Sequence, residues 1–103
     1  MNKNIVEEFN NIYNTCKDIA DNKTRTEINE LFIEELRELI KAITKHERWI
    51  KGDISLRSSY SEIVDNLYKD LADVIIMILQ FTCKKRISHK DLINIITEKI
   101  DNN

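Results

Sequence analysis

The chain has one glycine and no proline among its 103 residues. Tight turns draw heavily on these two residue types, and an all-β sandwich or barrel needs a turn about every 8–12 residues. The shortage therefore excludes such folds, whereas helices tolerate it. Because apolar residues recur at spacings of three and four along most of the chain, we expect a single all-α domain over residues 1–103.

Four helices are predicted, at about residues 2–21, 24–49, 59–85 and 88–100. The last three begin with a capping-box pattern, in which Thr or Ser is followed three residues later by an acid. These pairs are Thr24 with Glu27, Ser59 with Glu62, and Ser88 with Asp91. Gly52 marks one substantial loop, residues 50–57. Short connections favour antiparallel neighbours, so the pattern indicates a four-helix, bundle-like unit.

Charge and apolar run length limit the partners that we expect. The 16 basic and 18 acidic residues give a net charge of −2, which argues against a nucleic-acid partner. The longest uninterrupted apolar run, residues 74–79, is far shorter than the roughly 20 residues of a membrane span. The N-terminal residues lack the apolar core of a secretory signal. We therefore expect a cytoplasmic protein with no membrane partner.

The two cysteines, Cys16 and Cys83, lie at apolar helical positions. They form no Cys-x-x-Cys motif, so neither a zinc site nor redox chemistry is indicated. We expect both to be free thiols packed among apolar side chains.

Acidic residues occur at unexpected positions on the second and third predicted helices. With an advance of about 100° per residue, Glu35 projects within the apolar arc of its helix and Glu38 lies at the margin of that arc. Asp70 and Asp73 repeat this arrangement on the third helix. Residues three apart are neighbours on a helix surface. Antiparallel packing of these helices would therefore bring four carboxylates together.

Such a cluster has two interpretations. Several carboxylates in a partly desolvated site are strongly unfavourable unless protons or cations neutralise them, and Mg²⁺ or Mn²⁺ suits an all-oxygen site. Alternatively, the acids form ordinary flanking salt bridges with Lys41, Lys45 or Lys69. A di-iron site is not supported, because neither histidine follows a glutamate in a Glu-x-x-His motif.

The acids belong to two motifs in a recognisable order. These are Glu34-Glu35-Leu36-Arg37-Glu38-Leu39 and Asp70-Leu71-Ala72-Asp73-Val74-Ile75. The pair resembles the signature of the MazG-like all-α nucleoside triphosphate pyrophosphohydrolase superfamily, Glu-Glu-x-x-Glu and then Glu-x-x-Asp before an apolar run. The resemblance covers residues 28–103. Asp70 stands where the family usually has Glu, and the gap between the motifs is slightly longer than usual. A second candidate, Glu62 with Asp65, lies on the polar side of its helix and is set aside.

The resemblance implies a fold of the MazG or dimeric dUTPase type and hydrolysis of an NTP or dNTP to the monophosphate and pyrophosphate. It implies that Mg²⁺, or Mn²⁺, is held by Glu35, Glu38, Asp70 and Asp73, with Glu35 or Glu38 orienting or deprotonating the attacking water. Lys99 and Asn103 would contact the substrate. Trp49 is interpreted either as an interface aromatic or as a stacking platform for the base.

The third predicted helix is apolar around most of its circumference, which is typical of a helix buried on all sides. One chain of this size hardly provides such burial, so we expect a homodimer or homotetramer. Two narrower enzymatic alternatives are a dUTP- or dCTP-directed hydrolase and a phosphoribosyl-ATP pyrophosphohydrolase. An alternative of another class is a helical oligomerisation or regulatory module that has lost its activity.

Overall fold

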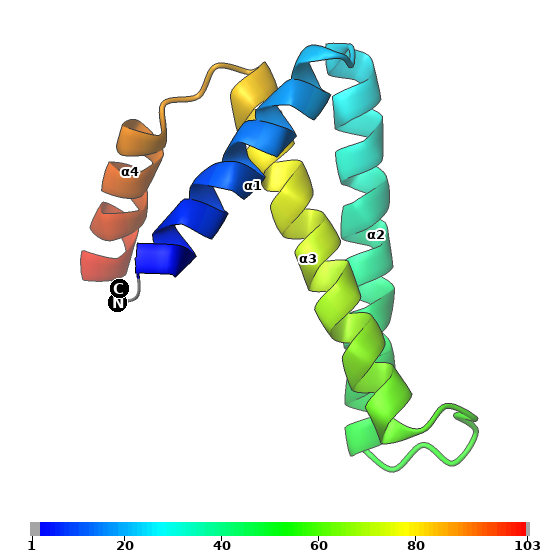
Figure 1. The fold of residues 1–103 in the computed structure, drawn as a ribbon. Helices are drawn as coiled ribbons and strands as arrows, with labels where there is room; N and C mark the ends of the chain where they lie inside the picture. The colour runs from blue at the N-terminus through cyan, green and yellow to red at the C-terminus, as the bar shows by residue number, and fades with distance from the viewer. Residues whose placement is uncertain (1–2, 103) are drawn as a thin grey trace. The chain divides into compact units, whose positions relative to one another are not determined.

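The computed structural model describes residues 3–102, which form four helices (Figure 1). They are α1 (Lys3–Asp21), α2 (Arg25–Ile50), α3 (Tyr60–Lys84) and α4 (His89–Asp101). These residues contain no strand, so the prediction of an all-α chain with four helices is confirmed. Every described helix boundary lies within one residue of its predicted position. No helix in this part of the chain combines the length and apolarity needed to cross a bilayer.

The helices begin where the capping patterns predicted. At the start of α2, the Glu27 backbone N–H donates to Thr24 Oγ1 and the Thr24 N–H donates to Glu27 Oε1, both at 3.1 Å. At the start of α3, the Glu62 N–H donates to Ser59 Oγ at 3.2 Å, and Ser88 is the N-cap of α4. These bonds satisfy N–H groups that have no partner within the helix.

The chain divides into two compact units, each described here by itself. Residues 29–78 form the hairpin unit, in which α2 and α3 lie side by side and antiparallel, joined by the loop of residues 51–59 (Figure 1). The terminal unit comprises the residues up to Ile28 and those from Leu79 onward. It contains α1, the first turn of α2, the end of α3 and α4. The assignment of residues 1–103 to one domain stays a prediction.

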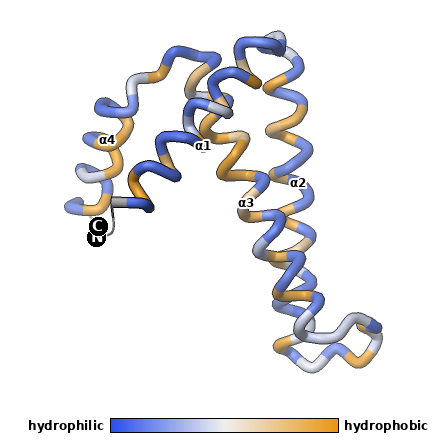
Figure 2. Tube along the Cα trace, viewed as in Figure 1, coloured by the Kyte–Doolittle hydropathy of each residue, from blue (hydrophilic) through white to orange (hydrophobic). Residues whose placement is uncertain are grey.

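The hairpin unit buries few of its apolar side chains. Ile63, Val74 and Met77 are the buried apolar residues, at 2%, 7% and 5% exposure. Hydrophobic residues recur along both helices of the hairpin (Figure 2), and many of them are exposed. Those exposed include Leu31, Ile33, Leu36, Ile40, Ile43, Leu71, Ile75, Ile76 and Ile78. The hairpin unit therefore leaves much apolar side-chain surface in contact with water.

The terminal unit packs around residues of α1 and the end of α3. Cys16 is buried, Cys83 is half-buried, and both are free thiols, as the sequence predicted. Burial, with a smaller effect of Cys83, raises the pKa of the Cys16 thiol. The Tyr13 ring packs edge-on against the His89 ring with 4.7 Å between centroids, and Thr82 Oγ1 lies 3.4 Å from His89 Nε2. These contacts connect α1, α3 and α4.

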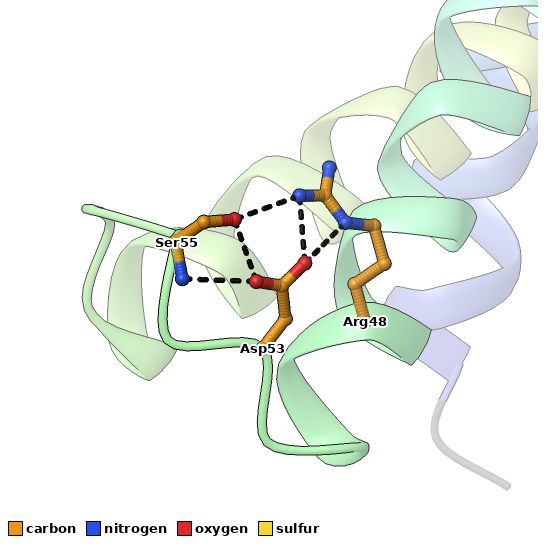
Figure 3. Close-up of polar contacts among 3 residues, drawn as sticks. All are labelled: Arg48, Asp53 and Ser55. Atoms are coloured by element: carbon orange, nitrogen blue, oxygen red, sulfur yellow. Dashed lines mark hydrogen bonds and ion pairs between the residues drawn. The ribbon is translucent and has the colours of Figure 1, made fainter.

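The loop between α2 and α3 is organised by one carboxylate (Figure 3). Asp53 Oδ2 accepts a hydrogen bond from Arg48 Nε at 2.8 Å and lies 2.7 Å from Arg48 Nη2. Asp53 Oδ1 accepts from Ser55 Oγ at 2.6 Å and from the Ser55 N–H at 2.9 Å. Gly52, the predicted loop marker, has a φ of 81°, in the left-handed region that glycine adopts without strain. The sequence predicted the loop but not this network.

Candidate functional site

All four predicted acids belong to the hairpin unit. Glu35 and Glu38 lie on α2, and Asp70 and Asp73 lie on α3. Glu35, Glu38 and Asp70 are half-buried, whereas Asp73 is exposed. A polar residue three positions from another lies beside it on the same helical face. Each helix therefore carries a pair of neighbouring acids on or beside its packed face.

Glu35 of α2 interacts electrostatically with acids of α3. Its pKa is raised above the ordinary value, first because burial disfavours the charged form and next because of the negative charges of Asp73 and Asp70. A side-chain hydrogen bond with Asp73 raises the pKa further, and Glu34 adds a smaller effect. The structure therefore brings Glu35 together with Asp73 and Asp70.

We call Glu35, Glu38, Asp70 and Asp73 together the acidic face, and three of them line a hollow of about 430 Å³. Its lining residues are Glu38, Lys41, Ala42, Lys45, Asn66, Lys69, Asp70 and Asp73. Three of the four predicted acids therefore share one hollow with three lysines. Glu35 does not line the hollow, but it interacts with two acids that do.

One of these lysines pairs with a predicted site acid. Lys41 Nζ lies 3.2 Å from Glu38 Oε1, one helical turn away, with 74% and 42% of the two side chains exposed. Exposed pairs of this kind contribute little to stability, because water screens the charges and two flexible side chains lose freedom. The interpretation as a flanking salt bridge therefore applies to Glu38 in this structure, and the contact leaves its second carboxylate oxygen available.

The other two lysines have different partners. Lys69 Nζ lies 2.9 Å from Asp65 Oδ2, and Lys45 Nζ donates to Ser58 Oγ at 2.9 Å. Within residues 3–102, the two α3 acids that line the hollow form no salt bridge. The negative charge of the α3 acids is thus not neutralised by a direct ion pair.

The alternative acid pair has other roles. Glu62 accepts a hydrogen bond from Ser59 Oγ at 3.2 Å at the start of α3, and Asp65 holds Lys69. Neither residue lines the hollow. These contacts agree with the sequence interpretation that placed Glu62 and Asp65 on the polar side of their helix.

The donor chemistry of the acidic face fits a hard divalent cation. In the described part of the chain, no three His, Cys, Asp or Glu side chains are close enough together to form a metal cage. Mg²⁺ does not need such a cage, because it usually keeps several waters and takes one or two protein carboxylates together with substrate phosphates. The carboxylates of Glu35 and Asp73, with Asp70 nearby, meet that requirement.

Trp49 lies near the loop end of the hairpin unit. Its ring centroid is 4.4 Å from that of Tyr60, with a 41° angle between the planes, and the residue is 39% exposed. Next to Tyr60 lies an apolar pocket of about 340 Å³. The residues lining it are His46, Tyr60, Val64, Leu67, Tyr68 and Leu71. Sequence reasoning missed this pocket, although its α3 residues recur at spacings of three and four.

The predicted substrate contacts near the C-terminus belong to the terminal unit. Lys99 lies in the last turn of α4 and lines a hollow with Ile95, Glu98 and Asn102. Asn103 lies outside the described residues. The assignment of Lys99, Asn103 and Trp49 to substrate binding stays a prediction.

No protein-family model, curated protein or solved structure matches the chain.

Proposed function

We propose that the protein hydrolyses a nucleoside or deoxynucleoside triphosphate to the monophosphate and pyrophosphate with Mg²⁺ or Mn²⁺, as its resemblance to the MazG-like superfamily implies. The observation that supports this most is the position of Glu35 beside Asp73 and Asp70, where burial and like charge raise its pKa. A site that holds like charges together at an energetic disadvantage favours binding of a cation.

Glu35, Glu38, Asp70 and Asp73 are the proposed ligands of the ion. When bound, the ion neutralises phosphate charge and polarises the phosphorus–oxygen bonds. Of the two acids that the resemblance implies for activating water, Glu35 is the proposed general base, because it is half-buried beside Asp73 and Asp70. Glu38 is proposed to orient that water.

The lysines of the hollow suit the substrate phosphates. Lys41, Lys45 and Lys69 line the same hollow as three of the acids. A triphosphate that carries a divalent ion presents both signs of charge, with negative oxygens around a positive metal. The acids would bind the metal ion, and the lysines would donate hydrogen bonds to the phosphate oxygens. Trp49 is a candidate for stacking on the base, with Lys99 and Asn103 as further substrate contacts.

The exposed apolar side chains of the hairpin unit support a homodimer or homotetramer. Ile40, Ile43 and Ile75 are 63%, 51% and 55% exposed, and a second copy of the chain would remove such side chains from water. Sedimentation velocity is expected to give a dimer or tetramer. Ile75→Lys is expected to shift the population to a smaller species, while Lys51→Gln, a change at an exposed polar position, leaves it unaltered. A monomeric wild-type protein would contradict the proposal.

A second candidate function is a non-catalytic helical oligomerisation or regulatory module. Asp70 in place of the Glu that is usual in the resembled family favours it. The dUTP- or dCTP-directed and phosphoribosyl-ATP hydrolases remain narrower versions of the first proposal, and their distinction depends on the base pocket.

Pyrophosphate release from a panel of NTPs and dNTPs with Mg²⁺ tests the two functions. We expect turnover by the wild type and a loss of about 100-fold for Glu38→Gln, which is the scale of a missing water-orienting carboxylate. Glu30→Gln, an exposed acid on the same helix, is the matched control and keeps its activity. No turnover with any nucleotide, together with no effect of metal on the melting temperature, would favour the module.

A further inference from the structure

The terminal unit contains a basic hollow outside the proposed active site. Its volume is about 440 Å³, and Asp21, Arg25, Cys83, Lys84, Lys85 and Arg86 line it. Four of the six lining residues are cationic and one is acidic, in a chain whose net charge is −2. The basic hollow is therefore a local concentration of positive charge that the overall composition does not suggest.

The cations of the basic hollow are poorly neutralised by the protein. Arg25, Lys84 and Arg86 form no salt bridge within residues 3–102. Lys85 Nζ lies 5.4 Å from the centroid of the Phe81 ring, a contact that leaves its charge in place.

Two acids face this group. Asp21 lines the hollow without an ion pair in the described part of the chain. The Glu27 carboxylate interacts electrostatically with Lys84. It also accepts a hydrogen bond from the Thr24 N–H. Four cations and two carboxylates still leave an excess of positive charge that an anion would offset.

Arg86 occupies a backbone position that disfavours its side chain. Its φ is 55°, and the Arg86 and Ile87 N–H groups donate to the carbonyls of Cys83 and Thr82 at 3.2 and 3.0 Å. This is the hydrogen-bond pattern of a Schellman motif, in which glycine is the usual residue at the left-handed position. An arginine there works against the local backbone preference. Its presence adds a guanidinium to the lining of the basic hollow.

We propose that the basic hollow binds an anion with two or more linked phosphoryl groups, either free pyrophosphate or the phosphate tail of a nucleotide. Its volume lies within the range of small-molecule sites. Two arginines supply planar donor pairs that match phosphate oxygens, and two lysines supply point charges. Four cations in a concave site suit linked phosphoryl groups better than a single one. The site uses none of the acids of the hairpin unit.

Calorimetric titration of the full-length protein with sodium pyrophosphate, at low salt and with EDTA present, tests the proposal. Arg86→Gly removes the cation and supplies the residue that the left-handed position prefers, so the variant is expected to melt at the same or a higher temperature. Its affinity for pyrophosphate is expected to fall about tenfold, the scale of one lost charge-assisted interaction. Arg86→Lys is expected to retain more of the affinity than Arg86→Gly.

Two controls separate this site from others. Lys51→Gln removes a cation of the hairpin unit and is expected to bind pyrophosphate as the wild type does. Asp70→Asn impairs the proposed active site and is expected to leave metal-free pyrophosphate binding intact, so an inactive enzyme would not affect this result. Equal affinities of the wild type and Arg86→Gly, an equal loss in Lys51→Gln, or no binding by the wild type would overturn the proposal.

Parallel titrations with ATP and adenosine identify the source of the phosphates. Similar affinities for pyrophosphate and ATP would indicate recognition of phosphoryl groups alone. Tighter binding of ATP, with no binding of adenosine, would indicate a nucleotide held chiefly by its tail. Adenosine binding as tight as that of ATP, unaffected by Arg86→Gly, would contradict the proposal.

Discussion

Two carboxylates of the hairpin unit have opposite electrostatic surroundings. Asp53, in the loop, has Arg48 and Ser55 as partners, and its pKa falls from 3.8 to about 2, chiefly because of the hydrogen bonds from Ser55 and Arg48. Glu35, on α2, is half-buried beside Asp73 and Asp70, and its pKa is raised. The fold stabilises the charge of Asp53 and disfavours that of Glu35.

The contrast distinguishes a structural acid from a candidate functional one. Asp53 already has donors for both carboxylate oxygens, so it needs no external partner. Glu35 gains most from a group that the protein does not supply, either a proton or a cation. Perturbed carboxylates of this kind cluster at functional sites. The predictions below test this distinction in order of decreasing effect.

The largest expected effect is on catalysis. Asp70→Asn removes one charge beside Glu35 and one proposed metal ligand, so we expect pyrophosphate release to fall about 100-fold. Asp70→Glu keeps the carboxylate, restores the residue usual in the resembled family and is expected to be at least as active as the wild type. Asp53→Asn, at the structural acid, is expected to keep its activity at temperatures well below its melting point. Equal losses of activity in Asp53→Asn and Asp70→Asn would contradict the division into a structural and a functional acid.

Metal binding should stabilise only a protein with an intact acidic face. At a free Mg²⁺ concentration of 100 times the dissociation constant, a single site adds about 2.7 kcal/mol to the free energy of unfolding. In a chain of this size, that corresponds to an increase of roughly 10–20 °C in melting temperature. Differential scanning fluorimetry with and without Mg²⁺ should show the increase in the wild type and in Asp53→Asn. Asp73→Asn should show little of it.

The loop network should give an acid-dependent loss of stability. Because the folded-state pKa of Asp53 lies near 2 and its ordinary value is 3.8, its stabilising effect is fully present above the ordinary value. The effect is lost as the pH falls through about 2. Asp53→Asn should therefore melt a few degrees below the wild type at neutral pH, and the gap should close toward pH 2. A gap that did not depend on pH would show that the carboxylate charge is not responsible.

The smallest expected effect is a slight rise in melting temperature, opposite in sign to the effect expected of Asp53→Asn. The folded-state pKa of Glu35 is raised from 4.5, so the stability associated with its protonation is present below that value and lost as the pH rises through the raised pKa. Without metal at neutral pH, Glu35→Gln is expected to melt slightly above the wild type, because it removes the repelled charge. Thermal melts from pH 4 to 8 should show the two proteins converging in acid, with Glu30→Gln unchanged relative to the wild type throughout.

Periodicity and capping chemistry explain what could be predicted from the sequence. The starts of α2 and α3 follow from the hydrogen bonds of Thr24 and Ser59, which act over three residues and need no tertiary context. The inward position of Glu35 follows in the same way, because helical geometry fixes its angle relative to neighbouring apolar residues. Local rules were sufficient where the interaction itself is local.

Pairing choices were harder to predict. Lys69 has acids at both neighbouring helical positions, Asp65 before it and Asp73 after it, and the structure pairs it with Asp65. An acid four residues before a lysine interacts more favourably than the reverse, so this preference was available in the sequence. The pairing of Arg48 with Asp53 was not, because it depends on the path of an irregular loop. The left-handed backbone of Arg86 was equally hidden, since no glycine marks the position.

The contact between Trp49 and Tyr60 has an optical consequence. Trp49 is the sole tryptophan of the chain, so all indole fluorescence originates beside one phenol ring, 4.4 Å away between centroids. Any event that separates the two rings changes the emission, whether a base slides between them or the end of the hairpin opens. The chain thus carries a built-in spectroscopic reporter of one end of the hairpin unit.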